Sequence, residues 1–132
     1  MDAAVIRFTT ELFDVTKERP NDINPIYGES LLLWLAEKLK GHVEVPKPQT
    51  EDWGWYVDVE AAGANYLVGA SGDAENSTSE IEWIVQVHKH RSLKEKILGQ
   101  NKMAVDDPLV ALIESIVRAD PQISEVSIDR NA

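Results

Sequence analysis

Apolar and polar residues alternate most regularly along residues 51–60. The apolar side chains of this stretch share one parity, and they are Trp53, Trp55, Val57 and Val59. Polar groups, among them Asp58 and Glu60, take the other parity. Because successive side chains of a strand point to opposite faces, this period of two predicts a strand with one buried and one polar face. We therefore expect a central strand here, with Trp53 in the core.

A leucine-rich stretch over residues 31–40 has the spacing of a helix instead. Its apolar residues recur at intervals of three and four and form a broad stripe. Ser30 is suited to cap the start of this helix, and Gly41 is suited to the first position after its end. A stripe of this width predicts a helix that lies on a sheet, with Leu35 buried.

The segments on either side of this helix are less regular. Residues 1–16 fit both a strand and a helical stripe, and their threonines and β-branched residues favour the strand. Residues 43–45 are expected to form a short edge strand, because Pro46 and Pro48 interrupt the chain directly afterwards.

Three more strands follow the central one, at residues 65–71, 81–90 and 123–128, and a turn at residues 61–64 makes the first of them a hairpin. Two helices separate the last two strands. Ser92 and Glu95 form a capping box, and Asp107 followed by Pro108 is a typical helix start. Strands grouped in this way predict an α+β fold, with a twisted antiparallel sheet of about four to five strands and two main helices on one face.

Two stretches rich in Pro, Asn, Gly and Ser are expected to be loops, residues 17–27 and 72–79. The second is small and polar throughout and should be the most mobile internal segment. The first either packs around the helix start or holds a ligand. The polar residues that would then contact the ligand are Asp14, Thr16, Asn21 and Asn24.

The composition narrows the class of protein. The chain has 132 residues, of which 43% are apolar and none is Cys, so thiol chemistry and Cys-ligated metals are excluded. No apolar run approaches the roughly 20 residues that span a bilayer, and the N-terminus lacks a signal-peptide pattern. We expect a single domain over residues 1–132 that is cytoplasmic and has no contact with membranes.

The net charge of -10 is unevenly distributed. Residues 41–80 carry eight acids and one base, a net -7, whereas residues 88–102 carry five bases and one acid, a net +4. The overall sign disfavours nucleic acid as a partner. An acidic face serves solubility alone or docks on a basic protein, and the residues that would form it are Glu51, Asp52, Asp58 and Glu60.

Side chains that could carry chemistry are few. His88 and His90 lie on one strand face, but the neighbouring Lys89 and Arg91 disfavour a metal ion. Asp58 and Glu60 have the spacing of a carboxylate pair, although such pairs on a wet strand face are usually solvated. The tryptophans are expected to pack in the core in preference to forming a platform for a ligand. We therefore assign no catalytic, cofactor-binding or metal-binding residue and expect no cofactor.

The order of the motifs resembles a group of small bacterial proteins of unassigned function. The residues that carry the resemblance are Asn24-Pro25-Ile26, the Ser30-capped helix and Glu51-Asp52-Trp53-Gly54-Trp55. The resemblance implies a bacterial source and a free-standing domain, and no activity.

Two functions fit these features. The first is a non-enzymatic protein-binding module, such as an inhibitor, an immunity-type protein or an adaptor, with an acidic interaction face. The second is a small-ligand-binding protein or enzyme that uses a pocket between residues 14–30 and the central strand. A deep pocket with convergent polar groups would favour the second.

Overall fold

A computed structural model describes residues 3–14, 18, 26–72 and 81–130. Its elements in chain order are β1 (Ala3–Thr10), α1 (Glu29–Leu39), β2 (Gln49–Glu51), β3 (Gly54–Ala61), β4 (Ala64–Gly72), β5 (Ile81–Lys89), α2 (Leu93–Leu98), α3 (Pro108–Ala119) and β6 (Ile123–Asp129). The N-terminal segment is therefore a strand, as its β-branched residues favour. The expectation of high mobility for residues 72–79 falls, apart from Gly72, outside the described residues.

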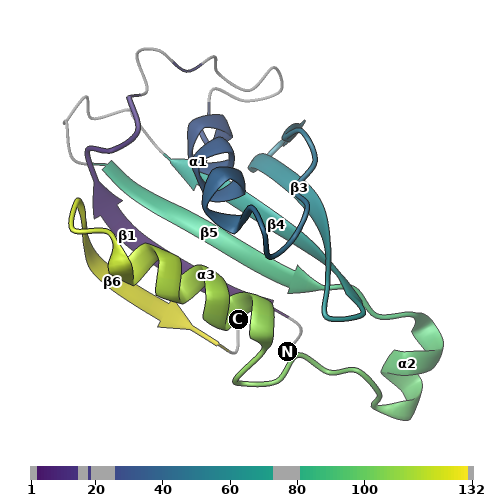
Figure 1. Cartoon of the computed structure of the whole chain (residues 1–132). Coiled ribbons are helices and arrows are strands. Elements are labelled where there is room, and N and C mark those ends of the chain that lie inside the picture. The colour runs from purple at the N-terminus through teal and green to yellow at the C-terminus, as the bar shows by residue number, and fades with distance from the viewer. Residues whose placement is uncertain (1–2, 15–17, 19–25, 73–80, 131–132) are drawn as a thin grey trace.

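The strands form one antiparallel sheet in the order β2-β3-β4-β5-β1-β6. Helices α1 and α3 lie on the same face of this sheet, and α2 projects from the end of β5 (Figure 1). The α+β class is confirmed. The sheet has six strands, with the short β2 at one edge and β6 at the other.

The edge strand β2 is not where the sequence placed it. Residues 43–45 were expected to pair, but they have no regular structure, and β2 begins only at Gln49. The physical reason is the pair of prolines. Pro46 and Pro48 lack backbone N–H donors, so a ladder cannot run through them, and pairing starts after the second.

The core lies between the sheet and the two helices. Leu35 is only 2% exposed and packs with Leu31, Leu32 and Leu39 of α1 against the valines of β3, β4 and β5, which confirms the predicted helix face. Trp83, Tyr66 and Phe8 are among the largest fully buried side chains.

Trp53 departs from the prediction, because it is only half-buried. It precedes β3 in the turn after β2, and Gly54 follows it with a φ of 154° that ordinary residues rarely adopt. The alternation therefore breaks before Trp55. The Trp53 ring covers Gly69 of β4, where an added Cβ would come within 2.4 Å of it.

Helix α1 also starts differently from the prediction. Its N-cap is Gly28 and not Ser30, and a glycine has no side chain that could cap the helix. Instead, the Glu18 carboxylate accepts hydrogen bonds from the backbone N–H groups of Gly28 and Glu29, at 2.5 and 2.6 Å, and from the Ser30 hydroxyl. A glycine is needed at position 28, since a Cβ there would lie 2.5 Å from the Ala70 carbonyl oxygen.

The predicted caps of the two later helices are confirmed. Ser92 and Glu95 make the reciprocal capping box of α2. Asp107 caps α3 by accepting from the N–H groups of Leu109 and Val110, and its other oxygen accepts from the Tyr66 hydroxyl at 2.7 Å. Burial, together with this bond and the charge of Asp107, raises the pKa of Tyr66 above its ordinary value. Asp107 thus ties α3 to β4.

Candidate functional site

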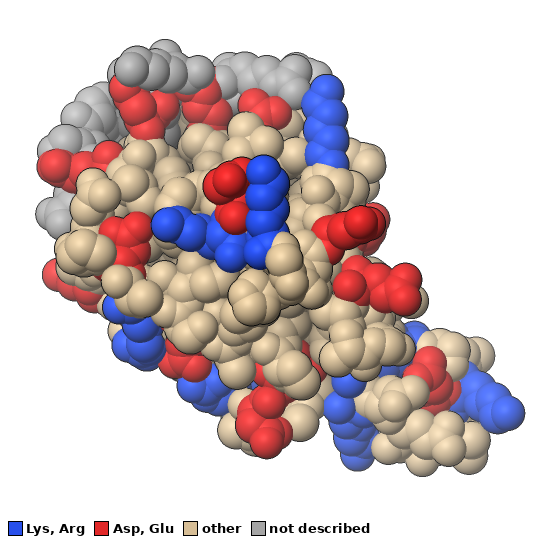
Figure 2. Space-filling model, viewed as in Figure 1, with Lys and Arg blue, Asp and Glu red and all other residues tan. Residues whose placement is uncertain are grey.

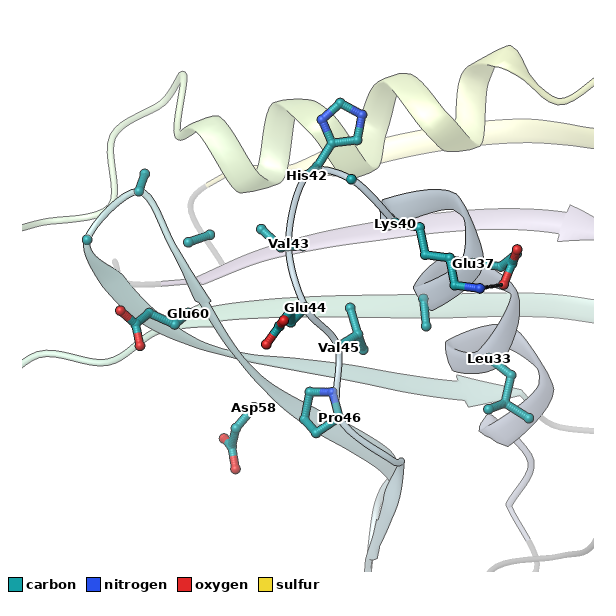
Figure 3. A pocket seen from close by; sticks show the side chains of 15 residues that line it. Leu33, Glu37, Lys40, His42, Val43, Glu44, Val45, Pro46, Asp58 and Glu60 are labelled. Atoms are coloured by element: carbon teal, nitrogen blue, oxygen red, sulfur yellow. Dashed lines mark ion pairs between the residues drawn. The ribbon is translucent and has the colours of Figure 1, made fainter.

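A groove of about 1040 Å³ opens between α1, the segment after it and the β3–β4 hairpin. We call it the acidic groove. Its walls are Leu33, Ala36, Glu37 and Lys40 of α1 and its end, residues 41–46, and Asp58, Glu60, Ala61, Ala62 and Gly63 of the hairpin. In Figure 3 the segment through Val43 and Pro46 diverges from β3, and the Glu44 side chain points into the space between them.

The groove exists because β3 is longer than the strand beside it. β2 pairs with β3 only from Glu51↔Gly54 to Gln49↔Tyr56. Beyond Tyr56, the segment that contains Pro46 diverges from β3 (Figure 3), and its Val43 and Val45 pack against the core. Among the residues that the structure describes, β3 therefore has a strand on only one side from Asp58 to Ala61.

The register shows which backbone groups face the groove. The hairpin closes with a two-residue turn, in which Ala62 and Gly63 have φ values of 51° and 77° and Ala61 pairs with Ala64. In an antiparallel ladder, pairs that exchange hydrogen bonds alternate with pairs that do not. Val59 and Val57 thus bond to β4, while the N–H and C=O groups of Asp58 and Glu60 point to the free edge.

One independent contact supports this assignment. Asn65 lies opposite Glu60, and its carbonyl accepts a hydrogen bond from the backbone N–H of His90, at 2.8 Å, on the side away from β3. Asn65 therefore does not bond Glu60. The backbone of Glu60, and of Asp58 two residues earlier, is directed outward.

Carboxylates dominate the charge of the groove. Glu44, Asp58 and Glu60 are exposed. Glu37 pairs with Lys40 at 3.0 Å, and Asp58 lies 3.9 Å from the Nε2 atom of His90. Exposed pairs of this kind contribute about 0–1 kcal/mol each to stability. Their charges together make the groove negative, and such a field acts over a longer range than the single pairs.

Two of the four acidic residues predicted for an interaction face lie in the groove. Asp58 and Glu60 line it, whereas Glu51 and Asp52 lie at the turn between β2 and β3 and do not. Glu44, Val43 and Val45 were not predicted as residues of an interaction site, because residues 43–45 were interpreted as a strand. The two prolines after them were the available signal that this segment leaves the sheet.

The predicted ligand loop is only partly described. Asp14 lines a hollow of about 390 Å³ with Phe13, Glu18, Ser30 and Trp34, against the start of α1 and not against the central strand. The Glu18 carboxylate in this hollow is engaged with the helix start. Thr16, Asn21 and Asn24 lie outside the described residues, so their predicted role stays a prediction.

The histidines and tryptophans are dispersed. The His88 ring is bonded to Gln86 at 3.1 Å, and burial, with a smaller effect of His90, lowers the pKa of His88. Across the described part of the chain, no group of three or more His, Cys, Asp or Glu side chains is placed to hold a metal ion. Trp55 and Trp83 are buried in the core. Trp53 lies on the opposite face of the sheet, beside a second hollow.

Comparisons with known proteins give no relative: no protein-family model, curated protein or solved structure matches the chain. None of the helices in the described ranges is long and apolar enough to cross a membrane. Inferences about function therefore rest on the geometry of the grooves.

Proposed function

We propose that this chain is a protein-binding module whose acidic groove receives an extended, basic segment of another protein. The observation that carries the proposal is the free edge of β3. The backbone groups of Asp58 and Glu60 face the groove and offer donors and acceptors to an incoming strand. Addition of a strand to an exposed sheet edge is a common mode of peptide recognition.

The edge also determines which sequence fits. Residues of the incoming strand that lie opposite Asp58 and Glu60 share the outer face with these carboxylates, so they should be Lys or Arg. The residue between them turns to the helix side of the sheet, where Val43, Val45 and Leu33 line the groove. It should be apolar and β-branched. The preferred segment therefore alternates basic and apolar residues.

Charge attracts such a segment before it pairs. The screening length at physiological salt is about 8 Å, so the carboxylates of the groove act together on an approaching cation. We propose that a protein that works in this way is an inhibitor, an immunity-type protein or an adaptor. Its proposed setting is the bacterial cytoplasm.

The test uses a fluorescein-labelled peptide that alternates lysine and valine, with binding followed by fluorescence anisotropy. We expect saturable binding that weakens as salt rises, and at least a tenfold loss of affinity in Asp58→Lys/Glu60→Lys. The double variant Glu51→Lys/Asp52→Lys is the matched control, since it makes the same change in net charge outside the groove. It should bind within about threefold of wild type.

Two further peptides separate strand pairing from charge. A lysine–valine peptide whose lysine backbone nitrogens are methylated keeps the charge but lacks the N–H donors that would face Asp58 and Glu60. A peptide that alternates glutamate and valine keeps the pairing but reverses the charge. Both should bind at least tenfold more weakly. Equal binding of the N-methylated peptide, or equal losses in the two double variants, would refute the edge as the binding site.

A further inference from the structure

Helix α2 is held together by local groups and not by packing. None of its six residues is buried. The Ser92–Glu95 capping box closes its start, and Gly99, in the left-handed conformation, closes its end. Because a helix of this length is marginal in water by itself, the two caps stabilise it in place of a core. Figure 1 shows α2 projecting from the body beyond the end of β5.

We call residues 92–105 the arm, and its surface is apolar to an unusual degree. Four of the five large apolar residues that are exposed in the described part of the chain belong to the arm, and they are Leu93, Ile97, Leu98 and Val105. Leu93 and Ile97 are each 74% exposed and lie one turn apart, on what we call the apolar side of α2. Single exposed apolar residues are normal, but a group of them on one projection marks an interaction surface.

The arm is also basic, in a chain whose net charge is -10. It carries Lys94, Lys96 and Lys102 and one acid, Glu95, a net +2. Successive residues of a helix are about 100° apart, so Lys94 and Lys96 lie on the two flanks of the apolar side and Glu95 lies opposite it. The Glu95 carboxylate is bonded within the capping box and also acts on Arg91, which precedes the arm. The partner of the apolar side should therefore be apolar and acidic.

The acidic groove has this complementary composition. The fifth exposed apolar residue, Leu33, lines it, and so does the exposed Pro46. Glu44 and Glu60 line it with exposed carboxylates, and Figure 3 shows the Glu44 side chain pointing into the space. Complementary charge of this kind selects partners and speeds their encounter. The chain thus carries both halves of one interface.

The two halves lie near each other, but they do not meet within one copy. None of the residues of the arm lines the groove. Yet Asp58 of the groove lies 3.9 Å from His90, which is two residues before the arm. A two-fold axis beside this point can place each arm in the groove of the other copy. Such a contact is closed and symmetric, and two-fold dimers are the commonest homo-oligomers.

We propose that two copies of this chain form a dimer in which the arm of each copy occupies the acidic groove of the other. The apolar side of α2 then packs on Leu33, while Lys94 and Lys96 face the carboxylates of the groove. The dimer regulates the groove, because a basic segment of another protein must displace the arm to reach β3. This regulatory role rests on the proposed function, whereas the dimer itself does not.

Sedimentation equilibrium of the full chain, from about 1 µM to about 1 mM, measures the dimer. We expect a monomer–dimer equilibrium whose dissociation constant rises with salt, since the contact pairs opposite charges. Leu93→Ser/Ile97→Ser should weaken the dimer at least tenfold. Neither residue is buried, so this variant should keep the fold of the monomer, which circular dichroism verifies.

Charge reversal gives the sharpest test. The arm variant Lys94→Glu/Lys96→Glu and the groove variant Glu44→Lys/Glu60→Lys should each dimerise at least tenfold more weakly than wild type, because both contacts then bring like charges together. An equimolar mixture of the two variants should dimerise again, since each of its two contacts pairs opposite charges. The control Glu51→Lys/Asp52→Lys makes the same charge change outside the groove and should dimerise like wild type.

Three results would overturn the proposal: a wild-type chain that stays monomeric over the whole range, arm and groove variants that dimerise like wild type, and a mixture of the two that fails to dimerise. A monomer whose arm binds phosphatidylglycerol vesicles would overturn it as well and would assign the arm to a lipid surface.

The lysine–valine peptide separates this proposal from the proposed function. It should bind Leu93→Ser/Ile97→Ser at least as tightly as wild type, because no arm then competes for the groove. If wild type dimerises as expected but the peptide does not bind this variant, the proposed function fails and the dimer stands. If wild type is monomeric and binds the peptide, the dimer fails and the proposed function stands.

Discussion

Leu35→Ala should lower the free energy of unfolding by about 2–5 kcal/mol, as expected for a large-to-small change at a buried site. Leu35 is 2% exposed, and it lies in the middle of the α1 face that packs on the sheet. The neighbouring leucines and valines close the space around it, so the truncated side chain leaves a cavity that the core cannot fill without moving α1.

Urea unfolding followed by far-UV circular dichroism measures this effect. Leu33→Ala is the matched control, because Leu33 belongs to the same helix and is 54% exposed. It should change stability by less than about 0.5 kcal/mol. Equal unfolding midpoints for the Leu35 variant and wild type would contradict the packing of α1 described above.

Asp107→Ala should lower the free energy of unfolding by about 2–4 kcal/mol. Loss of a helix N-cap costs about 1 kcal/mol, and a buried polar group without its partner costs about 1–3 kcal/mol. Asp107 is 1% exposed and serves both purposes, since it caps α3 and accepts from the Tyr66 hydroxyl. Its removal also leaves Lys89 without the carboxylate 4.0 Å away.

The same urea assay applies, with two companion variants. Asp106→Ala changes the adjacent, exposed carboxylate and should be close to wild type. Tyr66→Phe removes only the hydroxyl bond and should cost less than Asp107→Ala. If Asp107→Ala and Asp106→Ala were equally stable, the hydrogen bonds of Asp107 that link α3 to β4 would not contribute to the free energy of unfolding.

Local signals predicted the elements whose structure depends on neighbouring residues. The Ser92–Glu95 box, the Asp107-Pro108 start and the hairpin turn before Ala64 all appear as expected. Each depends on side chains and backbone groups within a few residues of one another. The buried leucines of α1 follow from helical spacing in the same way.

Features that depend on distant parts of the chain could not be predicted. Glu18 caps α1 from ten residues before Gly28, so no short motif contains both groups. Trp53 has the parity of a core residue, but the positive φ of Gly54 takes it to the other face. The acidic groove arises because two prolines delay β2, and this outcome needs the pairing of the whole sheet.

The separation of charge along the chain persists in space. Figure 2 shows basic side chains on the projecting arm that carries α2 and acidic ones along the adjacent edge of the body. The acidic and basic segments meet at Asp58 and His90, 3.9 Å apart. Asp58 lines the acidic groove, and His90 lines the hollow beside Trp53.

The most direct test of the protein-binding proposal is amide hydrogen exchange, measured residue by residue by NMR with and without the saturating lysine–valine peptide. The N–H groups of Asp58 and Glu60 face the groove, so their exchange should slow at least tenfold when the peptide pairs with β3. Those of Val57 and Val59 already bond β4 and should change little. If the peptide binds but the N–H groups of Asp58 and Glu60 exchange as fast as they do without it, strand addition at this edge is contradicted.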